Sequence, residues 1–143
     1  KSTTLHEVQP PQILFLERCL QLLKPRGRLG LVLPEAVFGM PTYEYVVTWL
    51  QRRAKIRGIV SMPEALFKTS GKGGTHAKVC VLFVENTKVK EGEDYDIFMA
   101  DVKWCGHDSR ANPTYRKDKE GNLVLLDEVP KVHEKWASIM GEW

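Results

Sequence analysis

The chain has 143 residues, the length of one domain, and 43% of them are hydrophobic, which is enough for a buried core. Its formal net charge of +3 neither requires nor excludes a nucleic-acid partner, so any basic surface must be local. No apolar run approaches transmembrane length and no signal peptide is recognisable, so the sequence gives no support to a membrane-spanning class.

Three cysteines, Cys19, Cys80 and Cys105, lie far apart and lack metal-ligand spacing. Cys19 and Cys80 fall in apolar runs, as buried thiols do. An odd number of unpaired cysteines indicates a reducing compartment, and we expect a cytoplasmic protein. Because the sequence starts with Lys1 and not with Met, we also expect a piece of a longer protein.

The first predicted helix covers residues 12–24, where apolar side chains recur at positions 13, 16, 19, 20 and 23. Pro25 and Gly27 end this helix. Residues 28–34 form a short and continuously apolar run that ends at Pro34. Such a run predicts a strand that is buried on both faces.

A second helix is predicted over residues 42–54, and further strands over 55–63 and 77–86. The helix between the first two strands predicts that they pair in parallel. Only a loop of about a dozen residues precedes the third strand, and no helical crossover fits there, so we expect this strand to be antiparallel. The fold class is therefore α/β, in which ligands bind at the carboxyl ends of the parallel strands.

From about residue 87 the sequence becomes charged and turn-like. We predict an edge strand at 97–102, a polar loop at 103–122 and a helix within 126–143.

The segment SGKGGTHAK, residues 70–78, contains three glycines and two lysines and superficially matches a phosphate-binding loop. A Walker loop needs a helix after its Lys-Ser/Thr pair, whereas Lys78 is followed by Val79 and a strand-like run. We therefore do not expect a nucleotide phosphate in this loop.

A second motif, ANPTY at residues 111–115, is similar to the Asn-Pro-Pro-Tyr motif with which amino-methyltransferases grip an exocyclic amine. That motif must end a buried strand, but the residues before Ala111 are GHDSR, which do not form one. We expect an ordinary Asn-Pro turn.

No metal site is expected. The histidines are scattered, and the pair with the closest spacing to a ligand pair, Cys105 and His107, lies in a predicted loop. The four histidines are His6, His76, His107 and His133.

A basic cluster ends the second helix and enters the second strand. Cations at a helix C-terminus favour the helix dipole, so we expect a solvated helix end, with phosphate contact as the alternative. The cluster consists of Arg52, Arg53, Lys55 and Arg57.

Phe67 precedes the glycine-rich loop at the predicted ligand edge of the sheet. It could be a core residue, or it could stack on a nucleic-acid base while Lys68, Lys72 and Lys78 contact phosphates. The residues alone leave both hypotheses open.

Two segments in this order resemble the N6-adenine DNA methyltransferases of restriction-modification systems, especially the modification subunits of type I enzymes. The first, ILFLERCLQLLKPRGRLGLVLPEAVF at residues 13–38, has the family's Leu-Leu-Lys-Pro-Gly-Gly-Arg form, with Arg26 replacing one glycine, and then a strand ending in Leu-Pro. The second, at residues 55–86, has a strand ending in Pro, a Phe, a Gly-rich loop and a last strand. Val79 stands where Thr or Ser is common.

The resemblance implies a partial Rossmann-like methyltransferase fold, with the fifth, sixth and antiparallel seventh strands and flanking helices. Residues 1–86 would be the C-terminal half of the catalytic domain, and residues 87–143 an extension. The family binds S-adenosylmethionine after its first strand and holds the target amine after its fourth. Both motifs would lie upstream of Lys1, so we expect no catalytic or cofactor-binding residue in this chain and no activity alone.

The resemblance also implies roles for particular residues. Phe67 would stack on the flipped-out target adenine, because an enzyme cannot reach the adenine amine inside the duplex. Lys68, Lys72 and Lys78 would contact the DNA backbone. Glu35, just after the first strand, would lie at the edge of the target pocket.

The implied partners are double-stranded DNA and a specificity subunit, with a restriction subunit as a further candidate. Two alternatives remain open at this point. One is a methyltransferase of the same fold that acts on RNA or protein. The other is a non-enzymatic Rossmann-like domain used for assembly.

Overall fold

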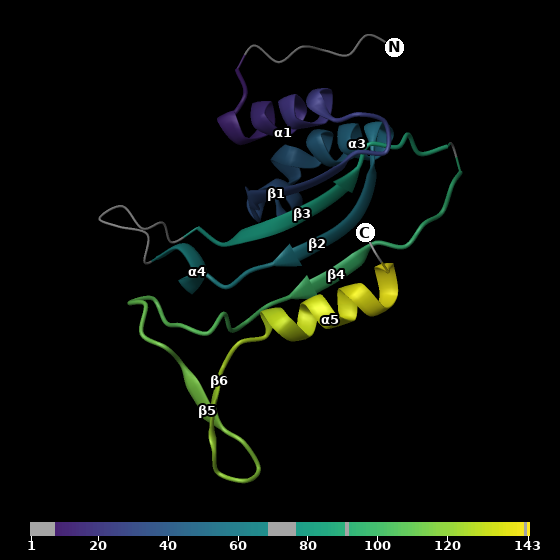
Figure 1. Ribbon diagram of the computed structural model, residues 1–143. Coiled ribbons are helices and arrows are strands. Elements are labelled where there is room, and N and C mark those ends of the chain that lie inside the picture. The colour runs from purple at the N-terminus through teal and green to yellow at the C-terminus, as the bar shows by residue number, and fades with distance from the viewer. Residues whose placement is uncertain (1–7, 69–76, 91, 142) are drawn as a thin grey trace.

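The computed structural model describes residues 8–68, 77–90, 92–141 and 143. Four strands form one mixed sheet in the order β1-β3-β2-β4 (Figure 1). The strands are β1 (Arg28–Pro34), β2 (Lys55–Ser61), β3 (Val79–Glu85) and β4 (Phe98–Asp101).

Strand β3 lies between β1 and β2 and is antiparallel to both, while β4 is parallel to β2. The prediction of an antiparallel third strand is therefore confirmed. The prediction that the first two strands pair with each other is wrong: they share a direction, but β3 separates them. The short β2–β3 connection explains why β3 runs opposite to β2, and the structure places β3 between β2 and β1.

Helices from the first part of the chain cover one face of the sheet (Figure 1). The first helix begins with Pro11 in its first turn and buries Ile13, Leu16 and Leu20, as the apolar spacing predicts. Leu23 is already extended, since Pro25 disfavours a continued helix. The elements on this face are α1 (Pro11–Leu22), α2 (Ala36–Gly39), the 3-10 turn η1 (Pro41–Tyr43) and α3 (Glu44–Arg53).

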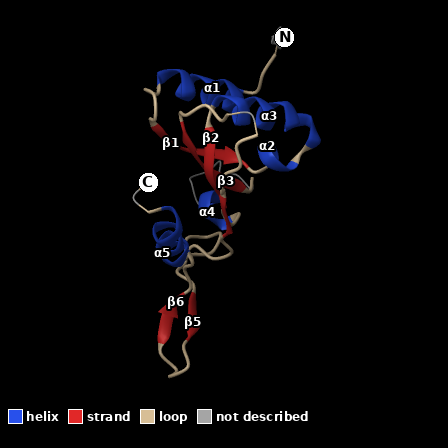
Figure 2. Ribbon diagram, turned by 90° about the vertical axis from the view of Figure 1, so that its right-hand side faces the viewer, coloured by secondary structure: helices blue, strands red, loops and turns tan. Residues whose placement is uncertain are grey.

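The opposite face is covered by α4 (Ala65–Lys68) and α5 (Val129–Met140), and α5 lies across the sheet from α1 and α3 (Figure 2). A β-bulge in β2 between Ile56 and Gly58 shifts the alternation of side chains by one residue, so that positions after the bulge point to the opposite face of the sheet. Ile56 therefore packs with α1 and α3, whereas Val60 packs with α5. The terminal helix predicted within 126–143 is confirmed.

Trp136 anchors α5 to the sheet. Its ring centroid lies 4.9 Å from that of Phe83 and 5.2 Å from that of Phe98. Gly58 makes this close approach possible, because a Cβ at that position would lie 2.3 Å from Trp136 Cζ3. The glycine is thus required by packing and not by backbone conformation.

Strand β1 departs from its predicted burial. Its burial alternates, with Leu33 1% exposed but Val32 48% exposed. Within the described residues β1 pairs only with β3, and no helix covers Val32, so the strand is not buried on both faces.

The predicted polar loop at 103–122 and the three residues after it contain more structure than expected. A two-stranded hairpin, β5 (Tyr115–Lys117) and β6 (Leu123–Leu125), projects from the body of the molecule (Figure 1). Sequence analysis missed these strands because each has three residues and all six are exposed, which gives no period-2 burial pattern.

The predicted Asn-Pro turn is only partly right, because the turn covers residues 108–112 and ends at Asn112, while Pro113 forms a β-bridge with His107 and Tyr115 begins β5. Asp108 Oδ1 accepts hydrogen bonds from the backbone N–H groups of Arg110 at 2.7 Å and Asn112 at 3.0 Å. The Asn112 amide donates to Asp108 Oδ2 at 3.2 Å, so it is engaged within the turn. The same arrangement recurs between Asp118 and Asn122 at the hairpin tip.

None of the described helices has the length and apolar character needed to cross a membrane.

Replacing Gly58 with alanine should destabilise the fold by about 1–3 kcal/mol, because the added methyl group would displace Trp136 from the sheet. Gly39→Ala is the matched control, since a Cβ there meets no atom within 4 Å. Urea unfolding followed by tryptophan fluorescence would measure both. Equal stabilities for the two variants would contradict close packing of α5.

Candidate functional site

Polar side chains gather at one edge of the sheet. The parallel strands β1, β2 and β4 end there, and antiparallel β3 begins there. We call four residues at this edge the carboxyl-edge cluster: Glu35 follows β1, Ser61 ends β2, Lys78 precedes β3 and Asp101 ends β4.

Lys78 lies between two carboxylates. Its Nζ is 3.2 Å from Glu35 Oε1 and 3.7 Å from Asp101 Oδ1. Glu35 is held more firmly than Asp101, because the Ser61 hydroxyl donates to Glu35 Oε1 at 2.8 Å and the Glu35 backbone N–H donates to the Lys78 carbonyl at 3.0 Å. Glu35 and Lys78 are thus held together by contacts that involve residues from four strand ends.

A hollow of about 510 Å³ lies beside these groups. This volume falls within the range of small-ligand sites. Its walls combine apolar side chains with the four polar residues of the cluster. The apolar and small lining residues are Phe38, Gly39, Ile59, Cys80, Met99 and Ala100.

The charges of the cluster affect two neighbouring groups. Hydrogen bonding to Glu35 raises the pKa of Lys78, the charges of Glu35 and Asp101 add to this effect, and burial opposes it. Lys78 is therefore a cation throughout the physiological range. Burial, helped by the charge of Glu35, raises the pKa of the Cys80 thiol from 9.0 to about 11.

A second hollow, of about 500 Å³, lies between β4 and α5. None of the predicted site residues lines this second hollow. It shares Met99, Ala100 and Asp101 of β4 with the first hollow. The carboxyl edge is the better candidate, because ligands of α/β sheets bind beyond the carboxyl ends of the strands.

Two of the predicted site residues, Glu35 and Lys78, are brought into direct contact. Phe67 and Lys68 lie in α4, the short helix after β2. Lys72 lies outside the described residues, as does most of the glycine-rich segment. Since a strand follows Lys78, the Walker-loop interpretation remains without support. The DNA and base-contact roles of these residues stay predictions.

Phe67 is half-buried and packs against the core cluster that contains Met62 and Val79. Part of its side chain therefore serves packing, and part remains accessible at the end of the sheet. A role in packing and a role in stacking are compatible with this position.

Sequence reasoning missed Ser61 and Asp101. Both are the last residues of strands in the structure, one or two residues before the ends of the strands predicted at 55–63 and 97–102, so the available signal was their position near a strand end. Which strand ends lie next to Glu35 depends on the strand order, which the sequence did not specify.

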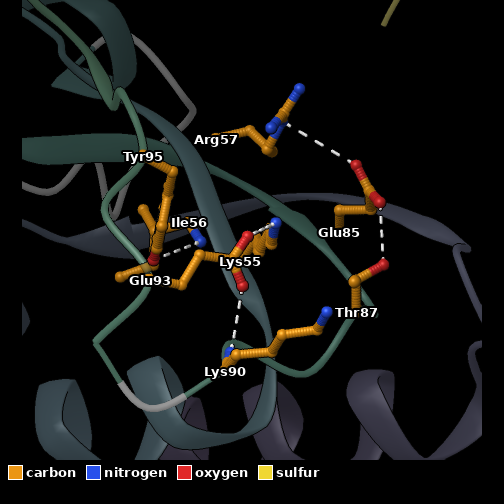
Figure 3. A network of polar contacts seen from close by, with 8 residues as sticks. All are labelled: Lys55, Ile56, Arg57, Glu85, Thr87, Lys90, Glu93 and Tyr95. Carbon is orange, nitrogen blue, oxygen red and sulfur yellow. Dashed lines mark hydrogen bonds and ion pairs between the residues drawn. The ribbon is translucent and has the colours of Figure 1, made fainter.

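The basic cluster lies at the opposite edge of the sheet, where β2 begins. Lys55 pairs with Glu93 and has its ammonium 5.7 Å from the Tyr95 ring, while Arg57 Nε is 3.8 Å from Glu85 Oε2 (Figure 3). The hydrogen bond from Lys55 is the main cause that lowers the pKa of Glu93. Lys55 is thus paired with Glu93 through a hydrogen bond, whereas Arg57 has only a longer ionic contact with Glu85 and its Nε makes no hydrogen bond within the described residues.

Cys105 Sγ lies 3.7 Å from His107 Nε2, and His107 Nδ1 is 3.0 Å from the Asp108 carbonyl oxygen. Across the described part of the chain, no three His, Cys, Asp or Glu side chains are placed to hold one metal ion.

Comparison with known proteins decides the family. A family model described as N-6 DNA Methylase matches residues 1–134. The chain belongs to the N-6 DNA methylase family. This confirms the resemblance inferred from the two sequence segments.

Two solved structures are similar to parts of the chain. One is a protein from Listeria monocytogenes that is described as a class I S-adenosylmethionine-dependent methyltransferase. It is 28% identical to this chain, with a TM-score of 0.50, and the match covers 62% of this chain and 26% of that protein. The other comes from a study of complex assembly and conformational transition in the type I R-M system. Its chain is 23% identical to this one, with a TM-score of 0.49, and the match covers 68% of this chain and 19% of that chain. No match was found among curated proteins.

The fold is thus Rossmann-like, as in class I methyltransferases. The chain spans about a quarter of the length of the Listeria protein that it matches.

Cys80 should resist alkylation in the folded protein. It is 1% exposed and its pKa is about 11, so only about 0.1% of it would be thiolate at pH 8. Iodoacetamide at pH 8, followed by peptide mass spectrometry, should label Cys19 and Cys105, which are partly exposed, before Cys80. In urea all three should react alike. Early labelling of Cys80 would show that the hollow opens to the core.

Proposed function

We propose that the chain is the C-terminal part of the catalytic domain of a DNA adenine-N6 methyltransferase of a restriction-modification system. The complete enzyme would transfer a methyl group from S-adenosylmethionine to adenine N6 in DNA. The observation that carries the proposal is the family match together with the antiparallel direction of β3, which the resemblance implied for the last strand.

Exposed apolar surface supports the idea that another part of the domain packs against this one. Leu14 and Phe15 on α1 are 51% and 67% exposed, and Val32 on β1 is 48% exposed. Within the described residues β1 is also the outermost strand on its side of the sheet. An upstream half with the fourth strand would pair with this edge and cover these side chains.

The described residues do not fit S-adenosylmethionine. Such sites use a glycine-rich turn between a strand and a helix N-terminus. Here β1 leads to α2 through Pro34 and Glu35, and the segment from β2 to α4 contains Pro63 and Glu64. We therefore assign cofactor binding and the grip on the target amine to the upstream half.

This chain would then contribute contacts to DNA. Phe67 would offer its accessible ring surface to the flipped adenine, and the base would leave the helical stack to reach it. Glu35 would border the target pocket, beside the hollow at the carboxyl edge. Lys68, Lys72 and Lys78 would contact backbone phosphates.

The proposed partners are double-stranded DNA and a specificity subunit, with a restriction subunit as a further candidate. The proposed location is the cytoplasm, where the free cysteines of this chain would stay reduced. No metal ion is part of the proposed reaction.

Adding an upstream half is the direct test of the proposed function. The chain alone should neither bind S-adenosylmethionine nor methylate DNA, because the cofactor and amine-binding motifs are missing. Joined to an upstream half that carries both motifs, it should transfer tritiated methyl groups to adenine in duplex DNA. Transfer to RNA or protein instead, or no cofactor binding at all, would overturn the proposal.

Phe67→Ala in the complete enzyme should weaken base flipping. Stacking on an aromatic side chain contributes about 1–3 kcal/mol per base, so the flipped state should become several-fold to about a hundred-fold less populated. A DNA duplex with 2-aminopurine at the target position would show a smaller fluorescence increase.

Phe67→Leu and Phe67→Tyr separate stacking from packing. Leucine keeps an apolar side chain but removes the ring, so the signal should fall while the midpoint of thermal unfolding changes little. Tyrosine keeps the ring and should keep the signal. An undiminished signal in Phe67→Leu would assign Phe67 to the core alone.

A further inference from the structure

The carboxyl-edge cluster combines two carboxylates with one ammonium group, Glu35 and Asp101 with Lys78. Its formal charge is therefore −1. In the proposed function this edge meets DNA, which is a polyanion. A phosphate that approaches Lys78 must compete with the carboxylates already beside it.

The two carboxylates differ in how firmly they are held. Glu35 is fixed by Ser61 and by the backbone of residue 78, and its Oε1 is the nearer to the Lys78 ammonium, at 3.2 Å. Asp101 stands at 3.7 Å with a side chain that is 58% exposed. At that distance and exposure it is a weak, screened ion-pair partner.

The ammonium group has three N–H donors, and its side chain is 40% exposed. Glu35 can occupy one donor and keep the side chain in place. The other donors face Asp101 and solvent. A phosphate oxygen can therefore bind without breaking the contact between Lys78 and Glu35.

We propose that Asp101 is a competing counter-ion at a phosphate-binding Lys78, and that a DNA backbone phosphate replaces it while Glu35 keeps Lys78 in position. This inference rests on the proposed function and adds Asp101 to its DNA-contacting site. Asp101 thus lowers the affinity for DNA, and Glu35 is a positioning residue.

The test uses the complete enzyme and a fluorescein-labelled DNA duplex, with binding measured by fluorescence anisotropy over a range of salt concentrations. Asp101→Asn should raise the affinity about two- to fivefold at 0.1 M salt, because it removes the competing charge of a weak, exposed ion pair. Lys78→Met, which keeps the aliphatic stem, should make the slope of log K against log salt shallower by about 0.9, the contribution of one phosphate contact.

The double variant Asp101→Asn with Lys78→Met distinguishes two explanations. Either a phosphate replaces Asp101 at Lys78, or the charge of Asp101 repels DNA independently of Lys78. If Asp101 acts through Lys78, the double variant should bind DNA as Lys78→Met does. Asp96→Asn is the matched control, because it removes the same charge just before β4, at the other end of that strand. At about 3.3 Å per residue, Asp96 is farther from Asp101 than the Debye length of about 10 Å at 0.1 M salt. The affinity of Asp96→Asn for DNA should therefore not change.

An unchanged salt slope in Lys78→Met would overturn the inference, as would an Asp101→Asn effect that persists in the double variant. If Lys78→Met does not fold, as judged by thermal unfolding, Lys78→Gln gives the same comparison. If the wild-type enzyme binds DNA but the variants give either contrary result, only the inference about Asp101 is overturned, and the proposed function stands. A wild-type enzyme that binds no DNA overturns the proposed function and this inference with it.

Discussion

The antiparallel pairing of β3 with both β1 and β2 is the constraint on which the rest of the structure depends. Because β3 runs against its neighbours, it starts where they end. Lys78, just before β3, is thereby placed at the carboxyl edge of the sheet, in contact with Glu35. One reversal of chain direction therefore assembles the candidate site from segments that are distant in sequence.

The two faces of the sheet are packed by different means. The face under α1 and α3 is a conventional aliphatic core, with Leu16, Leu50 and Leu82 fully buried. The other face depends on aromatic contacts of Trp136 above Gly58. The bulge in β2 serves both arrangements, since it allows one strand to direct apolar side chains first to one layer and then to the other.

Local patterns were sufficient for the long helices and long strands but not for the four-residue helices α2 and α4, because α1, α3 and the three seven-residue strands each have a clear apolar period or run. The strand order was not predictable, because loop length fixes direction but not position. The exposure of Val32 was not predicted, because the burial of a strand residue depends on which helices and strands cover it, and an apolar run does not specify these. Likewise, Glu35 and Lys78 were chosen singly, whereas Ser61 and Asp101 became visible only when four strand ends met.

The outer edge of β1 has a consequence for handling the protein. Its middle residues, Leu29 to Leu33, carry no charge, no proline and no bulge that would prevent another strand from pairing with it. Natural sheets protect such edges, since an unprotected apolar edge promotes intermolecular sheet formation. When this chain is produced with nothing paired to that edge, aggregation through β1 is therefore a hazard. Lysines introduced along β1 would improve solubility, but they would also replace the apolar side chains of this edge.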